Sequence, residues 1–159
     1  MEVKEIQEKL PEFIGNKTEL KNLHLTLKFL GEISFEKSEE IKERLKKINF
    51  NKFEAEICEI GFFDKYNHGI IWLGLNNCEA FQKEIDRALS ELYEGEKRFM
   101  AHLTIARVKK IKDKKKFLGN LKGINIPKMF FIVDKFYFIE SKLKKEGPEY
   151  ALLEEFGLK

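Results

Sequence analysis

Apolar residues three or four positions apart mark amphipathic stretches of the chain. They predict helices over residues 3–13, 35–48 and 78–93, and a shorter helix is indicated at residues 113–121. Pro11 should end the first helix, because proline lacks a backbone donor and clashes with the preceding turn. Ser34 can cap the second helix, because its hydroxyl can accept a hydrogen bond from the first turn.

Alternating or continuous apolar residues predict strands between these helices. The stretches are residues 23–30, 53–62, 69–75, 99–108, 129–140 and 150–156, with a turn at Asp64–Gly69 between the second and third. Strands and helices follow no regular βαβ alternation, which favours an α+β fold with mostly antiparallel sheets. No linker rich in Pro, Gly or Ser divides the chain, so we expect residues 1–159 to form a single domain.

Composition narrows the class of protein. The chain has 159 residues, 43% of them hydrophobic, which is enough for a core and excludes global disorder. Cys58 and Cys78 are too few for a disulfide scaffold and lack the spacing of a zinc site. No apolar run approaches the roughly 20 residues of a membrane-spanning helix, and no secretory signal is evident. We therefore expect a cytoplasmic protein with no membrane partner. We also expect a monomer, because the sequence contains no surplus apolar helix that would need to pack against another chain.

Two of the three histidines lie in nearly identical tetrapeptides, His24–Leu27 (HLTL) and His102–Ile105 (HLTI). Side chains two apart on a strand share a face, so the His and Thr of each motif project together while the aliphatic residues face the core. Two such strands facing each other would surround one cavity with two imidazoles and two hydroxyls. The alternative is a pair of half-buried strands whose His and Thr only face solvent.

Two imidazoles and two hydroxyls suit displacement at phosphorus. Histidine titrates near neutrality, so one imidazole can activate a water as base while the other protonates the departing oxygen. Threonine hydroxyls can donate hydrogen bonds to the non-bridging phosphoryl oxygens. This chemistry requires no metal and no cofactor. His68, the third histidine, lies in the predicted turn, where we expect an exposed side chain rather than a metal ligand.

The motifs make the sequence similar to the two-histidine (2H) phosphoesterase superfamily, which is defined by two His-x-Thr-x motifs. The resemblance is greatest to the RNA 2′,3′-cyclic phosphodiesterases, also called 2′-5′ RNA ligases. Residues 22–32 (NLHLTLKFLGE) resemble the first family motif and residues 101–109 (AHLTIARVK) the second. Ser141, Leu143 and Gly147–Tyr150 resemble a third motif.

This resemblance implies two pseudo-symmetric lobes, each an antiparallel sheet with packed helices, and an active-site cleft between them across which the motifs face each other. It implies that His24 protonates the leaving ribose oxygen as general acid and that His102 activates water as general base. Thr26 and Thr104 would hold the cyclic phosphate. The substrate would be RNA with a 2′,3′-cyclic phosphate end, or a cyclic nucleotide, and the product a 2′-phosphomonoester.

Phe29 and Arg107 each follow a motif histidine by five residues, and the resemblance implies that both bind the terminal nucleoside. Aromatic and guanidinium planes stack well on unpaired bases. On an ideal strand, however, an odd offset turns a side chain to the opposite face. Phe29 can therefore also be a core aromatic, and a bulge or strand end would be needed to bring either residue to the face of the histidines.

Two further features leave alternatives open. Family members usually begin with a short apolar strand, whereas Val3 already lies in a predicted helix, so we expect that strand to be missing from the first lobe. The lysine-rich residues 109–116 either steer RNA phosphates toward the site or form a solvated face.

Three functions remain open at this point. The leading hypothesis is metal-independent hydrolysis of cyclic phosphate ends, with 2′-5′ ligation as the reverse reaction at the same site. The alternative from a different class is an RNA-end binding module without turnover. The intact pairs His24/Thr26 and His102/Thr104 favour the enzyme, because a protein that only binds RNA ends would not need them.

Overall fold

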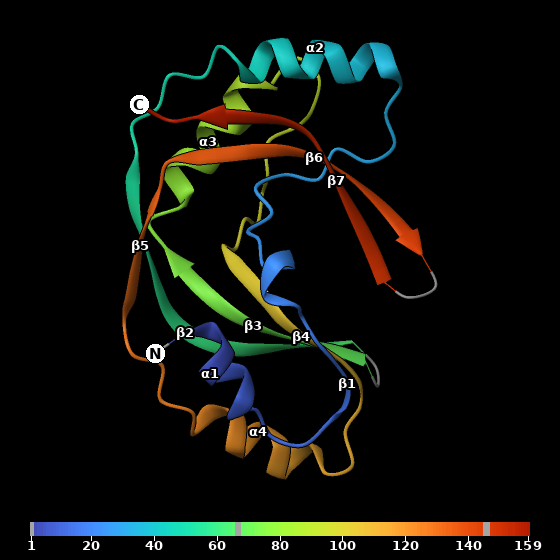
Figure 1. The fold of residues 1–159 in the computed structure, drawn as a ribbon, viewed down its shortest axis with the longest axis vertical. Helices are drawn as coiled ribbons and strands as arrows, with labels where there is room; N and C mark the ends of the chain where they lie inside the picture. Colours follow the sequence, from blue (N-terminus) through green and yellow to red (C-terminus); the bar gives the residue numbers. More distant parts are fainter. Residues whose placement is uncertain (1, 66–67, 145–146) are drawn as a thin grey trace. The chain divides into compact units, whose positions relative to one another are not determined.

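The computed structural model describes residues 2–65, 68–144 and 147–159, which form an α+β fold (Figure 1). The elements are α1 (Val3–Glu8), β1 (Ile14–Lys17), a 3₁₀ helix (Leu20–Asn22), α2 (Phe35–Leu45), β2 (Phe53–Lys65), β3 (His68–Asn76), α3 (Glu79–Ala88), β4 (His102–Lys110), α4 (Lys114–Lys122), β5 (Met129–Val133), β6 (Lys135–Lys144) and β7 (Gly147–Gly157). The predicted α+β class is confirmed.

The chain divides into two compact units. Unit 1 comprises Met1–Thr26, Ala55–Cys78 and Phe99–Phe131, and unit 2 comprises Leu27–Glu54, Glu79–Arg98 and Ile132–Lys159. Unit 1 contains α1, α4 and most of a five-stranded sheet, whereas unit 2 contains α2, α3 and a two-stranded sheet. Each unit therefore combines a sheet with two α-helices, as the resemblance implies.

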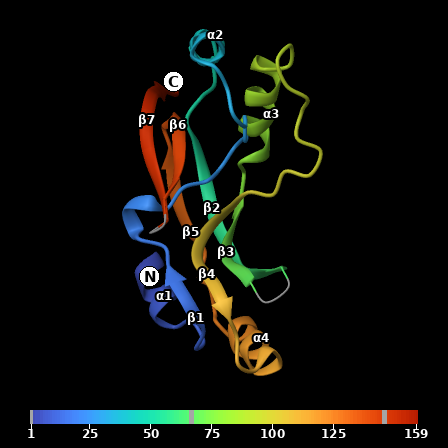
Figure 2. The same cartoon turned by 90° about the vertical axis from the view of Figure 1, so that its right-hand side faces the viewer.

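The sheet of unit 1 has the strand order β1-β4-β3-β2-β5. Strands β2, β3 and β4 can be followed side by side in Figure 1, and Figure 2 shows the same strands turned by 90°. The pairs β1–β4, β4–β3 and β3–β2 are antiparallel. Helix α4 packs on one face of this sheet, where the ring of Phe117 lies 5.3 Å from that of Phe62 in β2. Ile71 and Leu73 of β3 and Ile105 of β4 are completely buried. Ile71 and Leu73 share the face that helix α4 covers.

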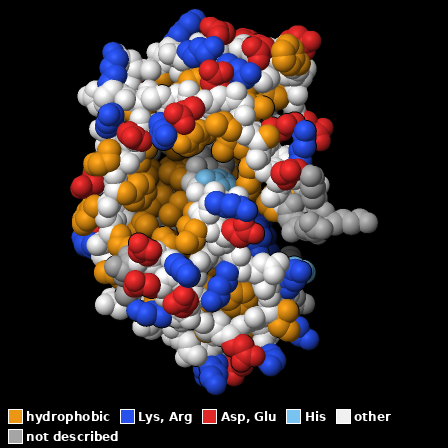
Figure 3. Space-filling model, in the orientation of Figure 1, with side chains coloured by type: hydrophobic (Ala, Val, Ile, Leu, Met, Phe, Trp, Pro, Cys, Tyr) orange, Lys and Arg blue, Asp and Glu red, His pale blue; other side chains and the backbone are white. Residues whose placement is uncertain are grey.

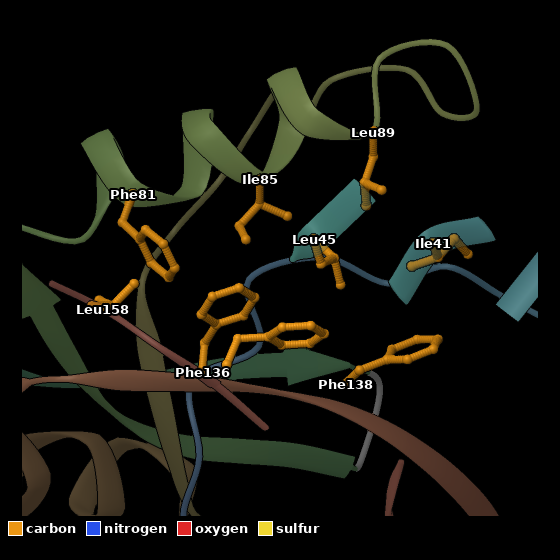
Figure 4. Packing of buried hydrophobic residues seen from close by; sticks show 9 residues of the cluster. Ile41, Leu45, Phe81, Ile85, Leu89, Phe136, Phe138 and Leu158 are labelled. Carbon is orange, nitrogen blue, oxygen red and sulfur yellow. The ribbon is translucent and has the colours of Figure 1, made fainter. Parts of the chain in front are cut away.

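Unit 2 has a separate hydrophobic core. Its strands β6 and β7 form an antiparallel hairpin, and the rings of Phe136 and Phe156 stack across it at 4.8 Å. Figure 4 shows Phe81 and Ile85 pointing from α3 toward Phe136. The other buried members of this core are Ile41, Leu45, Leu89, Phe138 and Leu158.

The helices agree with the sequence prediction in position and differ in length. Helix α1 ends at Glu8 rather than at residue 13, because Pro11 restricts the residue before it to extended backbone. Ser34 caps α2 as predicted, with Oγ accepting a hydrogen bond from the backbone N–H of Lys37 at 3.2 Å. Helix α3 ends at Ala88, before residue 93. None of the described helices is long and apolar enough to cross a membrane.

The strands differ more from the prediction. The stretch 129–140 is two strands, β5 and β6, which belong to different sheets and are separated at Asp134. Strand β1 was not predicted, because its sequence Ile-Gly-Asn-Lys lacks apolar alternation. The predicted turn at Asp64–Gly69 is too long, since Lys65 pairs with His68 and both belong to strands. Tyr66 and Asn67 of that turn lie outside the described residues.

Candidate active site

The two histidine motifs lie side by side in unit 1. Leu25 forms an isolated antiparallel bridge with Leu103 of β4. The predicted strand over residues 23–30 is wrong, because the chain makes this single bridge to the sheet and leaves unit 1 after Thr26. The resemblance implies motifs that face each other across a cleft between lobes, whereas the structure brings both motifs together within one unit.

The bridge fixes which motif residues face each other. In antiparallel pairing, the residues that flank a bridged pair are opposite one another, so His24 lies opposite Thr104 and Thr26 opposite His102. The two bridged leucines lie on the other face. The two histidines are then diagonal neighbours across the bridge. We call the sheet face that carries His24, Thr26, His102 and Thr104 the site face.

Each imidazole on the site face is held by a backbone carbonyl two residues earlier in the chain. Nδ1 of His24 lies 2.8 Å from the oxygen of Asn22, and Nδ1 of His102 lies 2.8 Å from the oxygen of Met100. A carbonyl can only accept, so Nδ1 carries a hydrogen in both rings. The neutral ring therefore has its lone pair on Nε2, and the protonated ring has a second N–H there. Each histidine can take or give a proton at Nε2.

Strand β4 contains a β-bulge within the second motif. Ile71 and Trp72 are consecutive on β3, but their partners on β4 are Ala106 and Thr104. Ile105 is the extra residue, without a partner on β3. Ile105 and Ala106 are both completely buried, although consecutive residues of a regular strand point to opposite faces. The alternation of side chains along β4 therefore shifts by one residue at the bulge.

This shift changes the face on which Arg107 lies. Arg107 pairs with Ile70, and Thr104 pairs with Trp72, two residues that are two apart on β3 and share a face. Arg107 thus lies on the site face with His102, exposed to solvent, despite its odd offset. The bulge that an odd offset requires for Arg107 is present. The contact of Arg107 with a nucleoside stays a prediction.

Two aromatic side chains border His102 on the site face. The ring of Phe63 lies 5.3 Å from the imidazole and nearly perpendicular to it, at 86°. The ring of Trp72 lies 6.5 Å from the imidazole and 5.1 Å from Phe63. Trp72 is buried, and its indole covers Gly61 on the site face rather than on the helix-covered face. Sequence reasoning missed Phe63, because only the pairing of β2, β3 and β4 shows which residues share a face with His102.

Phe29 does not belong to the hydrophobic core. Its side chain is 83% exposed, so the core interpretation is wrong. Phe29 lies in unit 2, two residues beyond the point at which the chain enters that unit. Its exposure leaves the ring available for stacking on a base, and its role as a nucleoside-binding residue stays a prediction.

Lys28 anchors the segment that follows the first motif in unit 2. Its side chain is only 5% exposed, and its Nζ donates to Asp86 Oδ1 at 2.6 Å and to the backbone oxygen of Glu94 at 2.7 Å. The backbone N–H of Glu96 donates to the other oxygen of Asp86 at 2.7 Å. Burial alone would raise the pKa of Asp86, but the hydrogen bonds from Lys28 and Glu96 outweigh burial and hold the pKa below its usual value.

The third motif lies on the hairpin of unit 2. Ser141 of β6 pairs with Tyr150 of β7, and Leu143 pairs with Pro148. Leu143 is 90% exposed, so it contributes no burial to the core of unit 2. Two pairs of residues of the third motif thus lie opposite each other on adjacent strands.

The lysine-rich residues 109–116 are partly neutralised by carboxylates. Lys112 pairs with Glu12 at 3.1 Å, and Lys114 pairs with Asp64. Figure 3 shows basic and acidic side chains interspersed on the face in view, together with an exposed histidine. These pairs are typical of a solvated surface, and steering of RNA by this stretch stays a prediction.

Metal ligands are not grouped in the part of the chain that the structure describes. Among residues 2–65, 68–144 and 147–159, no three His, Cys, Asp or Glu side chains come together in a way that could hold a metal ion. His68 is exposed at the first position of β3. The exposed side chain that the sequence predicts for His68 is present. Its lack of a metal-binding role stays a prediction.

The sequence matches known phosphoesterases. Residues 2–72 match the model of the LigT-like phosphoesterases. The chain is 35% identical over 141 residues to an RNA 2′,3′-cyclic phosphodiesterase of Thermotoga maritima, covering 84% of this chain and 74% of that relative. It is also 35% identical over 143 residues to an RNA 2′,3′-cyclic phosphodiesterase of Methanocaldococcus jannaschii, covering 87% and 82% of the two chains.

The fold matches solved phosphoesterase structures. A protein of Thermus thermophilus superimposes with a TM-score of 0.75 at 24% identity, over 98% of this chain and 88% of that one. The structure of E. coli LigT complexed with 3′-AMP gives a TM-score of 0.72 at 21% identity, over 97% and 91%. The relatives at 35% identity and the paired His-x-Thr motifs thus define a two-histidine phosphoesterase. Within that class, the chain belongs to the LigT-like phosphoesterase family, and the resemblance inferred from the sequence is confirmed.

Proposed function

We propose that this protein hydrolyses the 2′,3′-cyclic phosphate ends of RNA to 2′-phosphomonoesters without a metal ion. The observation that carries the proposal is the bridge that sets two His-x-Thr motifs side by side on one sheet face. This arrangement combines a proton donor, a proton acceptor and two hydroxyls, the groups that displacement at phosphorus needs. The names of the relatives from T. maritima and M. jannaschii, both RNA 2′,3′-cyclic phosphodiesterases, support the same reaction.

In the proposed reaction, the two histidines start in opposite protonation states. Nε2 of neutral His102 takes a proton from a water, whose oxygen forms a new bond to phosphorus. The bond from phosphorus to the ribose 3′ oxygen breaks, and Nε2–H of protonated His24 gives its proton to that oxygen. The carbonyls of Asn22 and Met100 keep both rings in the tautomer that this exchange uses. The assignment of acid and base follows the family resemblance, because the two motifs are equivalent in sequence.

The threonines and Arg107 are proposed to hold the substrate. The hydroxyls of Thr26 and Thr104 would donate to the non-bridging oxygens of the cyclic phosphate and keep the attacking and leaving oxygens in line. Arg107, on the same face, would stack on or pair with the terminal nucleotide, and exposed Phe29 would stack on its base. None of these roles needs a metal ligand.

The test is turnover of an RNA oligonucleotide that ends in a 2′,3′-cyclic phosphate, in the presence of EDTA. We expect the wild-type protein to convert the end to a 2′-phosphate. His24→Ala and His102→Ala should each lower turnover by about 10²–10⁴-fold, the usual contribution of a general acid or base. His68→Ala is the matched control, because it removes the remaining histidine, which is exposed at the start of β3.

Three outcomes would contradict the proposal. They are turnover retained in both motif variants, loss of wild-type turnover in EDTA, and a 3′-phosphate product. Binding of the oligonucleotide without conversion would indicate an RNA-end binding module instead. Folding of each variant, checked by circular dichroism, separates loss of chemistry from loss of structure.

The same groups can also join RNA ends. A 5′-hydroxyl oligonucleotide would take the place of water, and its oxygen would attack the cyclic phosphate to give a 2′-5′ linkage. Hydrolysis and ligation share the leaving oxygen, the general acid and the general base and differ only in the nucleophile, so the motif variants should lose both activities together. Hydrolysis dominates in dilute solution because water is in large excess, and added 5′-hydroxyl oligonucleotide tests for ligation.

A further inference from the structure

The backbone at the β-bulge of β4 is held from two sides. Ile105 has no partner on β3, so its carbonyl depends on other donors. The backbone N–H of Thr18, just beyond β1, donates to this carbonyl at 2.9 Å. The side chain of Gln7 in α1 donates to the same carbonyl, also at 2.9 Å.

Gln7 is a buried polar residue with a specific arrangement of partners. Its side-chain amide donates to the oxygen of Thr18 at 2.7 Å as well as to that of Ile105, and only 5% of Gln7 is exposed. An amide nitrogen has two hydrogens, which match the two carbonyls. Gln7 thus joins the chain after β1 to the bulged residue of β4, across 98 positions in sequence.

We infer that Gln7 is a positioning residue for the active site, because it fixes the bulge that turns Arg107 onto the site face. Without the bulge, the alternation of β4 would continue through Ile105, and Arg107 would point away from His102 and Thr104. A bulge is stable only when the backbone groups it frees are satisfied elsewhere. Gln7 supplies the second donor to the carbonyl of Ile105. It also donates to the carbonyl of Thr18, the residue whose backbone N–H is the first donor. The functional consequence rests on the proposed function.

A double-mutant cycle tests this inference. Gln7→Leu keeps a similar volume and removes both donors. If Gln7 acts through Arg107, Gln7→Leu and Arg107→Ala should each lower kcat/KM on the cyclic-phosphate oligonucleotide by a similar factor, about 10–100-fold, the range for loss of one stacking contact to a base. The double variant should then be no worse than either single variant. Effects that multiply would overturn the inference.

Gln82→Leu is the matched control for a purely structural role. Gln82 is also a buried glutamine whose side-chain amide donates to a backbone carbonyl, that of Leu27 at 3.5 Å, but it lies on α3 in unit 2. Its effect should multiply with that of Arg107→Ala, because it does not act through the bulge. All rates are measured well below the melting temperature of the least stable variant.

A measurement without substrate separates this inference from the proposed function. In ¹⁵N spectra, the Nε–H of Arg107 and the backbone N–H of Thr18 report the bulge directly. In Gln7→Leu we expect the Arg107 signal to shift and exchange of the Thr18 hydrogen to become faster. Unchanged signals would overturn the inference even if the enzyme is active. An inactive wild-type protein with changed signals would contradict only the proposed function.

Discussion

Gly61 is a residue whose missing side chain shapes the site. It pairs with Trp72 across β2 and β3, and a Cβ at this position would lie 2.2 Å from Cζ2 of the indole. The indole covers Gly61 and, together with Phe63, borders the imidazole of His102. A side chain at position 61 must therefore displace the indole. The orientation of His102 depends on that neighbour as well as on the carbonyl of Met100.

We predict that Gly61→Ala lowers both activity and stability. Overpacking at a filled site costs about 1–3 kcal/mol of unfolding free energy, and displacement of a catalytic group by about 1 Å can lower the rate by roughly 10²-fold. Gly119→Ala is the control, because nothing lies within 4 Å of a Cβ there. This change within helix α4 should raise stability by up to about 1 kcal/mol and leave activity unchanged. Equal behaviour of the two variants in urea unfolding and turnover would contradict this prediction.

At the scale of residues, the sequence identifies the site better than it identifies the surroundings of the site. The two His-x-Thr pairs can be recognised from the sequence, because the alternation of side chains along a strand is enough to put each His and its Thr on one face. The sheet face on which Arg107 lies cannot be predicted from the sequence, because it depends on the bulge at Ile105. The exposure of Phe29 is likewise invisible in the sequence, because an aromatic residue within an apolar stretch looks like core.

At the scale of elements, local signals predict helices and tertiary pairing decides strands. Ser34 and Asp113 cap α2 and α4, close to where the apolar periodicity predicts that these helices begin. The edge strand β1 is not predictable, because its four residues form a strand only through pairing with β4. Residues 23–30 show the converse, since their alternation suggests a strand but Leu25 alone finds a partner on the sheet.

The connection from the first motif into unit 2 depends on a buried ion pair. Lys28 follows Thr26 by two residues, and its side chain and that of Asp86 on α3 are 5% and 15% exposed. Glu96, at 3.8 Å from Nζ of Lys28, adds a weaker carboxylate. Removal of one partner from a buried pair leaves an uncompensated charge, which costs far more than loss of a surface pair.

We predict that Asp86→Asn lowers the free energy of unfolding by about 3 kcal/mol at pH 7, because Lys28 then stays buried without its nearest carboxylate. The exposed pair Lys21–Glu19 provides the control, and Glu19→Gln should cost less than about 1 kcal/mol. Urea unfolding at neutral pH measures both changes. Similar small losses in the two variants would show that the Lys28–Asp86 pair does not act as a buried one.

The same pair should make stability depend on pH. The pKa of Asp86 is lowered in the folded protein, so its contribution is present above the carboxyl pKa of the unfolded chain, about 3.9. The contribution is lost as the pH falls through the still lower folded pKa. The stability difference between wild type and Asp86→Asn should therefore shrink below about pH 4. A difference that is constant or grows on acidification would contradict this assignment.

At the scale of the whole molecule, the two units are interleaved along the chain. The chain passes from one unit to the other after Thr26, Glu54, Cys78, Arg98 and Phe131. Neither unit is a continuous segment, so neither can be excised as a fragment. The sequence shows that no linker divides the chain. It does not show which segments belong to which unit, because that depends on contacts between residues far apart in sequence.

This interleaving leads us to predict that the units unfold together. Trp72, the single tryptophan, lies in unit 1, so its fluorescence reports the unfolding of that unit.

Ile41 in unit 2 and Ile71 in unit 1 are both completely buried. Replacement of either by valine should cost about 1 kcal/mol, which lowers Tm by roughly 2–4 °C in a chain of this size. If unfolding is cooperative, Ile41→Val shifts the fluorescence transition of Trp72 as far as Ile71→Val does, and circular dichroism gives the same midpoint. If the units are independent, Ile41→Val leaves the fluorescence transition in place and moves only part of the circular dichroism change.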